Sequence, residues 1–144
     1  MTSKPAQSQA PTQVASPPAR RPDRLIVGIS GASGVIYGIR TLDALRELGV
    51  ESHLVVSRAA LLTLSQETDL KPDDLMGRAD VTYRLNDVGA AISSGSFKTR
   101  GMIMAPCSVR TMGEIATGVT SSLLTRAADV VLKERRRLVL MVRE

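Results

Sequence analysis

The sequence predicts an α/β domain in which helices cover both faces of a parallel sheet. Short, continuously apolar runs occur at residues 25–29, 52–56, 101–106 and 137–142, and stretches with helical spacing separate them. Such runs are typical of strands that are covered on both faces. The alternation of strands and helices favours right-handed βαβ units. We therefore expect a doubly wound, three-layer architecture.

The other elements are expected from local patterns along the chain. A helix should begin at Val35 and end at Gly49, with these apolar residues on its buried face: Val35, Ile36, Ile39, Leu42, Leu45 and Leu48. Ser108 should cap a helix that runs to about Thr117. Further helices are expected over residues 58–68 and 72–76 and from residue 123, a short strand over residues 81–85 and a loop over residues 93–96.

The loop after the first strand carries the clearest ligand signal: Gly28-Ile29-Ser30-Gly31-Ala32-Ser33-Gly34. Its glycines allow a sharp turn and a close approach to a ligand, and free amides at the start of the next helix would attract an anion. The G-x-x-G-x-x-G spacing differs from the dinucleotide fingerprint, and no P-loop Lys-Ser or Lys-Thr pair follows. The second strand ends in Ser57 and not in a ribose-binding acid. NAD and ATP are therefore disfavoured as ligands of this loop, and a phosphate or the edge of a flavin is favoured. The alternative is that the loop is an ordinary βα turn without a ligand.

Composition indicates one folded domain behind a leader. Residues 1–22 hold five of the seven prolines and no Leu, Ile or Phe, so residues 1–23 are expected to be a disordered tail and residues 24–144 a single domain. A transit peptide is the alternative reading of the tail. Three of the five net positive charges lie in the first 24 residues, and only 2% of residues are aromatic, so nucleic acid is not an expected partner.

The remaining composition bears on location and on metals. No apolar run approaches the roughly 18 residues of a membrane span. The single cysteine, Cys107, excludes an intrachain disulfide and fits a reducing, cytoplasmic location. We expect Cys107 to be a buried structural residue. His53 has no second histidine or cysteine at ligand spacing, so no metal is expected.

Five motifs occur together between about residue 24 and the end of the sequence: the glycine loop, Ser57, Ser93-Ser94-Gly95-Ser96-Phe97, Pro106-Cys107-Ser108 and residues 126–136. In this order and spacing they resemble the flavin prenyltransferase family of the UbiX type. The resemblance implies a flavodoxin-like, Rossmann-type fold that binds FMN. It also implies transfer of a dimethylallyl group from dimethylallyl monophosphate to reduced FMN, for use by a UbiD-type decarboxylase of ubiquinone or aromatic-acid metabolism. Members assemble as homo-oligomers, namely dodecamers.

The resemblance also implies roles for individual residues. The cofactor-binding positions would be Gly31, Ala32, Ser33, Ser57, Ser108, Val109, Arg110, Thr111 and Arg143. Arg126 and Lys133 match cations at the substrate phosphate, lent across a subunit interface. Glu144 matches the carboxylate that transfers a proton, with Ser33 assisting. Cations at a leaving phosphate and a carboxylate for the proton suit this chemistry, which needs no metal.

Two departures from the family pattern matter. Arg135-Arg136-Arg137 stands where the family usually has Arg-Arg-Pro. The sequence stops at Glu144, whereas the family continues into a helix and a strand with a tyrosine and a basic residue for the prenyl phosphate. We therefore expect a truncated chain with little transfer activity and a last strand that exposes Leu138, Leu140 and Val142.

Two alternative functions stay open. The chain could be a flavin-binding module without catalysis. It could also be a flavin-dependent cysteine decarboxylase of the same broad fold, which is disfavoured because the only histidine lies within a predicted strand.

Overall fold

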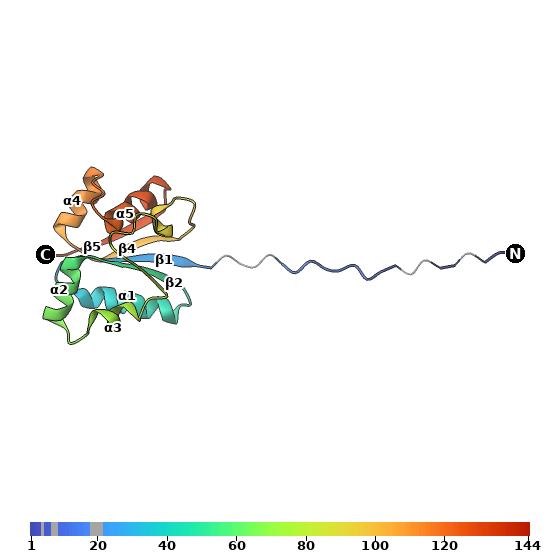
Figure 1. Cartoon of the computed structure of the whole chain (residues 1–144), viewed down its shortest axis with the longest axis horizontal. Coiled ribbons are helices and arrows are strands. Elements are labelled where there is room, and N and C mark those ends of the chain that lie inside the picture. Colours follow the sequence, from blue (N-terminus) through green and yellow to red (C-terminus); the bar gives the residue numbers. More distant parts are fainter. Residues whose placement is uncertain (4, 7–8, 18–21) are drawn as a thin grey trace.

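Five parallel strands form the sheet around which the chain folds (Figure 1). They are β1 (Arg24–Ile29), β2 (Glu51–Val56), β3 (Val81–Tyr83), β4 (Gly101–Cys107) and β5 (Arg137–Val142). Their order in space is β3-β2-β1-β4-β5, and every neighbouring pair is parallel. The first strand thus lies at the centre, with β2 on one side and β4 on the other. This arrangement confirms the predicted α/β fold and places a switch point between β1 and β4.

Helices cover the two faces of the sheet (Figure 1). On one face lie α1 (Val35–Glu47), α2 (Arg58–Glu67) and α3 (Pro72–Met76), and on the other lie α4 (Val109–Thr117), α5 (Leu123–Lys133) and the short 3₁₀ helix η1 (Ala91–Ser93). Side chains alternate along β1, so that Ile26 joins the core under α5 while Val27 and Ile29 join the core under α1. The sheet therefore separates two buried cores.

The predicted tail, residues 1–23, lies partly outside the residues that this computed structural model describes, which are 1–3, 5–6, 9–17 and 22–144. The described tail residues are exposed and form no helix or strand. Disorder of the tail stays a prediction. Within the described ranges, no helix combines the length and the apolar character that crossing a membrane requires.

The buried face of α1 is narrower than predicted. Val35, Ile39, Leu42 and Leu45 are buried as expected, but the Ile36 side chain is 46% exposed. Ile36 lies about 100° around the helix from Val35, which turns it away from the sheet. Leu48 was also predicted to be buried, and it is exposed because it follows the last helical residue.

Other boundaries differ from the predictions by one or two residues, for example at these ends. The strand predicted over residues 81–85 ends at Tyr83, and the helix predicted over residues 58–68 ends at Glu67. The loop predicted over residues 93–96 begins one residue later, because η1 includes Ser93. These are differences at element ends, where hydrogen bonding is weakest.

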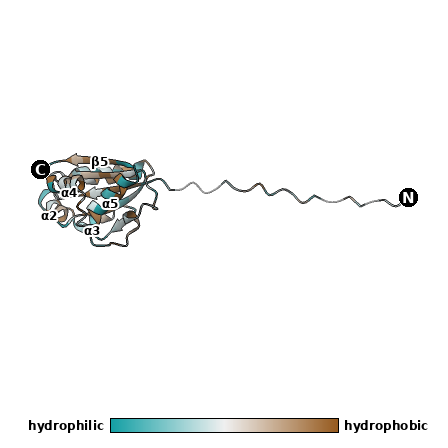
Figure 2. Cartoon of the chain, turned by 90° about the horizontal axis from the view of Figure 1, so that it is seen from above, coloured by the Kyte–Doolittle hydropathy of each residue, from teal (hydrophilic) through white to brown (hydrophobic). Residues whose placement is uncertain are grey.

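The β5 strand forms one edge of the described sheet, and Figure 2 shows its apolar character along that edge of the domain. Leu138 and Leu140 were predicted to be exposed, but they are partly buried against the core under α5. Val142 is exposed as predicted, and Val139 and Met141 are exposed with it. The alternation of side chains along the strand places Leu138 and Leu140 on the covered face and Val139 and Met141 on the open face. Val142 has the same register as the two leucines but is exposed at the end of the strand.

Candidate functional site

A cavity of about 430 Å³ lies where the carboxyl ends of β1, β2 and β4 meet. Gly31 follows β1, Ser57 follows β2 and Ser108 follows β4, so the three strand ends bring these residues to one place. Ligands of doubly wound sheets bind at this switch point. The cavity gathers five of the predicted cofactor-binding residues: Gly31, Ser57, Ser108, Arg110 and Thr111. Their role in cofactor binding stays a prediction.

Ser30 connects the two central strands beneath this cavity. Its hydroxyl donates to the Pro106 carbonyl over 2.9 Å and accepts from the Ser108 amide over 2.7 Å. Its own amide donates to the same carbonyl over 3.2 Å. Ser30 is 1% exposed, so these bonds are shielded from water. They hold the glycine loop and the segment after β4 in a defined relative position.

Ser57 and Ser108 each begin a helix as well as lining the cavity. The Ser57 hydroxyl accepts from the Ala60 amide at the start of α2, over 3.1 Å. The Ser108 hydroxyl accepts from the Thr111 amide at the start of α4, also over 3.1 Å. Both are N-caps, as predicted for Ser108. The positive ends of two helix dipoles therefore face the cavity.

Gly31 lets the glycine loop approach the first turn of α2 closely. A Cβ added at Gly31 would lie only 2.3 Å from the Cβ of Ala59. Ala59 lines the cavity beside Gly31, so a larger residue at either position would push the loop and the helix apart. The wall of the cavity depends on this contact.

Two amides at the start of α1 are bonded within the chain, whereas the sequence predicted amides that are free to attract an anion. The Glu67 carboxylate accepts from the Gly34 amide over 2.9 Å and from the Val35 amide over 3.1 Å. Glu67 is the last residue of α2. It acts as the cap of a neighbouring helix, because Gly34 has no side chain that could cap α1 itself.

The segment after β5 lies against the glycine loop. The Ser33 amide donates to the Glu144 carbonyl, over 2.6 Å, and Arg143 Nε donates to the Ser33 carbonyl over 3.0 Å. The Arg143 guanidinium also lies 5.0 Å from the centre of the Tyr37 ring. The structure thus brings together Ser33, Arg143 and Glu144, three of the predicted site residues. They lie outside the lining of the 430 Å³ cavity, as do Ala32 and Val109.

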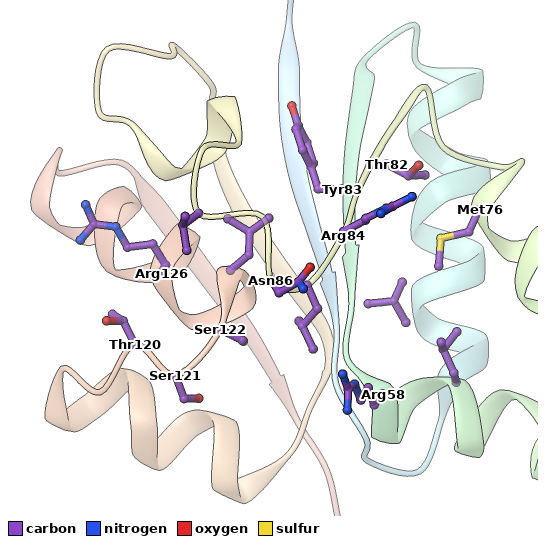
Figure 3. A pocket seen from close by; sticks show the side chains of 15 residues that line it. Arg58, Met76, Thr82, Tyr83, Arg84, Asn86, Thr120, Ser121, Ser122 and Arg126 are labelled. Carbon is purple, nitrogen blue, oxygen red and sulfur yellow. The ribbon is translucent and has the colours of Figure 1, made fainter.

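A larger cavity of about 1030 Å³ adjoins the first at the ends of β2 and β3. The two share Arg58, Leu85, Ser121 and Ser122. Three arginines line the larger cavity, namely Arg58, Arg84 and Arg126 (Figure 3). Its lining includes no carboxylate. Its other walls are largely apolar, as is usual for cavities that hold organic ligands.

The two predicted phosphate cations lie two turns apart on α5 and do not line the same cavity. Arg126 lines the larger cavity, but its guanidinium lies 3.7 Å from the Asp129 carboxylate and points away from Arg58 (Figure 3). Lys133 is exposed in the last turn of α5 and lines neither cavity. Within this chain the two residues do not form a common site. Their contribution across a subunit interface stays a prediction.

The serine motif before β4 lies against the end of α5. Arg136 donates to the Phe97 carbonyl over 2.9 Å and to the Gly95 carbonyl over 2.6 Å. The Ser94 and Ser96 hydroxyls are hydrogen-bonded to each other. Arg136 thus fixes the shape of this loop.

Cys107 and His53 occupy structural positions. Cys107 is fully buried, and burial raises the pKa of its thiol, which disfavours the reactive thiolate. His53 is buried in β2, where it contacts the Tyr83 hydroxyl and the Glu51 carboxylate. Burial raises the pKa of Tyr83. Across the described residues, no cluster of three or more His, Cys, Asp or Glu side chains could hold a metal.

Together the fold and the cavity define a doubly wound α/β protein with a cavity at its switch point, lined by the starts of two helices. The chain belongs to the Flavoprotein family, whose model matches residues 14–143.

Two relatives of known name are similar in sequence to this chain. The chain is 56% identical over 121 residues to the flavin prenyltransferase UbiX of Thauera aromatica, covering 84% of this chain and 62% of that protein. It is 59% identical over 122 residues to the protein of the same name from Escherichia coli K12, covering 84% of this chain and 65% of that protein. The chain therefore spans less than two thirds of the length of these relatives.

Solved structures agree with this likeness. A UbiX protein in complex with FMN and dimethylallyl pyrophosphate superposes with a TM-score of 0.85 at 48% identity, over 86% of this chain and 66% of that one. A dodecameric, FMN-dependent UbiX-like decarboxylase from Escherichia coli O157:H7 gives a TM-score of 0.82 at 49% identity. The match covers 84% of this chain and 66% of that one. The peptidyl-cysteine decarboxylase EpiD, at 18% identity and a TM-score of 0.64, shares the fold.

Proposed function

We propose that the chain forms the FMN-binding part of a flavin prenyltransferase. In this reaction a dimethylallyl group passes from dimethylallyl monophosphate to reduced FMN. A bond forms between the allylic carbon and the flavin, and the bond from that carbon to the phosphate oxygen breaks. The observation that carries the proposal is the 430 Å³ cavity, which gathers Gly31, Ser57, Ser108, Arg110 and Thr111 at the switch point.

The residues of the two cavities suit the two ends of FMN. Hydroxyls and two helix starts in the smaller cavity would hold the phosphate. The apolar walls of the larger cavity, which include Val56, Leu61 and Leu85, would exclude water from the flavin ring. Bound reduced flavin would supply the nucleophile for the allylic carbon.

The remaining roles follow the family. Arg126 and Lys133 would neutralise the leaving phosphate from a neighbouring subunit, and Glu144, with Ser33, would move a proton. The hydrogen bond from the Ser33 amide to the Glu144 carbonyl, which holds the two residues side by side, supports a shared task. The chain would form a homo-oligomer, a dodecamer by analogy with the O157:H7 protein, and its product would serve a UbiD-type decarboxylase. A cytoplasmic location is part of the proposal and agrees with the single buried cysteine.

A direct assay tests the proposal. The purified chain is titrated with FMN and then incubated with reduced FMN and dimethylallyl monophosphate, and the flavin product is analysed by mass spectrometry. We expect saturable FMN binding and, as the sequence predicts for this chain, little of the product that carries one dimethylallyl group. Absence of FMN binding would overturn the proposal.

Flavin binding without catalysis is the second candidate function. It is favoured by the fact that the chain spans less than two thirds of its curated relatives. Saturable FMN binding with no transfer product would select it over the enzyme.

A further inference from the structure

Arg58 holds a position that no other cation in the site shares. It is the first residue of α2 and follows Ser57, the N-cap that lines the smaller cavity. Its side chain is exposed and lines both cavities, and Figure 3 shows it at one end of the larger one. A ligand that extends from one cavity into the other would pass this guanidinium.

The charges around the smaller cavity leave Arg58 as its effective cation. The lining contains two arginines, Arg58 and Arg110, and one carboxylate, Glu114. Arg110 Nε lies 3.4 Å from the Glu114 carboxylate, so these two charges offset each other. Within the described part of the chain, no carboxylate lies within 4.0 Å of the Arg58 guanidinium. The charge of Arg58 is therefore available to a ligand.

The surroundings favour a doubly charged oxyanion there. The starts of α2 and α4 both face the cavity, and their dipoles add to the charge of Arg58. Hydroxyls of Ser57 and Thr111 are further donors at the same place, while the Ser108 hydroxyl donates to Thr111 Oγ1. A guanidinium presents several N–H donors in a planar fork that matches a phosphate.

We propose that Arg58 binds the FMN phosphate and makes the site select FMN over riboflavin. This inference rests on the proposed function, because it takes FMN as the ligand. Arg58 adds a side-chain charge to hydroxyl and amide donors that would otherwise contact the phosphate without neutralising it. The preference for FMN then comes from the attraction between the Arg58 charge and the phosphate, which riboflavin lacks.

Flavin fluorescence titrations with FMN and with riboflavin test the inference on the full chain. In Arg58→Gln we expect FMN affinity to fall about tenfold, the effect of one lost charge-assisted hydrogen bond, while riboflavin affinity is unchanged. Arg58→Lys should keep most of the preference for FMN. The same substitution at Arg40, an exposed arginine of α1 that lines neither cavity, is the matched control and should leave both affinities unchanged.

The outcomes separate the inference from the proposed function. If Arg58→Gln binds both flavins as the unmodified chain does, or loses both equally, Arg58 does not contact the phosphate. If the unmodified chain binds neither flavin, the proposed function is wrong, and this inference, which rests on it, is wrong as well. Circular dichroism of each variant shows that the fold is retained.

Discussion

A single hydroxyl at Ser30 joins the two central strands, and its loss should be costly. Ser30→Ala would leave the Ser108 amide and part of the Pro106 carbonyl without a partner in a region closed to water. We expect the free energy of unfolding to fall by about 1–3 kcal/mol, the cost of an unsatisfied buried polar group.

Urea denaturation measures this loss. Ser65→Ala is the matched control, because Ser65 is an exposed serine of α2 that bonds only within its own helix. Equal stability of the two variants would show that Ser30 does not hold the strands together.

Glu51 makes the stability of the chain depend on pH. Its carboxylate accepts from His53 Nε2 over 2.6 Å and from Arg24 Nε over 3.2 Å. The bond from His53 is the main cause that lowers the pKa of Glu51 below its ordinary value of 4.5, and burial opposes it. Because the folded pKa is the lower one, the carboxylate stabilises the fold above the unfolded pKa. That contribution is lost as the pH falls through the folded pKa.

Glu51→Gln isolates this contribution, because it keeps the shape and an acceptor but removes the charge. Above about pH 5 the variant should be less stable than the unmodified chain, and the difference should shrink as the pH falls. The difference should be at most about 1 kcal/mol, because the carboxylate is partly exposed and solvent screens it. Urea denaturation at a series of pH values measures it, and a gap that does not change with pH would contradict the assignment.

At the scale of elements, α2 stabilises α1 through one carboxylate. Glu67 satisfies the Gly34 and Val35 amides, which α1 cannot bond internally. Glu67→Ala should lower the free energy of unfolding by about 1 kcal/mol, as for the loss of an N-cap, and Glu67→Gln by less.

Thermal or urea denaturation gives the comparison. Glu47→Ala is the control, since Glu47 is exposed at the far end of α1, where a carboxylate faces the negative end of the dipole. A Glu67→Ala variant as stable as this control would show that the α1 amides do not depend on Glu67.

Residues of the site differ in how far the sequence can predict them. Ser57 and Ser108 could be predicted, because each directly follows an apolar strand and the carboxyl ends of parallel strands meet at one edge. Arg58 has the same positional signal, but sequence does not tell where a long side chain turns. Glu67 could not be predicted, because its contact joins residues 33 positions apart in different helices.

The fold as a whole could be predicted more completely than the site. Buried strands and amphipathic helices leave periodic patterns, and these gave the order of elements correctly. The closed start of α1 and the separation of Lys133 from both cavities depend on tertiary packing, which has no local pattern. The narrower face of α1 shows the same limit, since apolar Ile36 is oriented by the sheet and not by its own hydropathy.

The open face of β5 should make the 144-residue chain associate. Val139, Met141 and Val142 are exposed on a strand at the edge of the described sheet. Apolar edge strands pair with other chains, and a lysine on the edge prevents such pairing. The double variant Val139→Lys, Met141→Lys should therefore show a smaller average mass than the unmodified chain in light scattering at several concentrations.

The control for association is Leu62→Lys, which adds a charge at an exposed leucine of α2 away from this edge. It should leave the average mass unchanged. An unchanged mass in the double variant would assign the association to another surface.

The central place of β1 has a consequence for how the chain folds. A ribosome makes this strand before either of its neighbours, yet Ile26 must pair with Met102, far along the chain. Until β4 is synthesised, one side of the central strand has unpaired backbone groups and uncovered apolar side chains. Contacts between such distant segments also slow folding, because a long loop must close first. The cavity at the switch point, which needs both strand ends, would therefore be among the last features of the newly made chain to form.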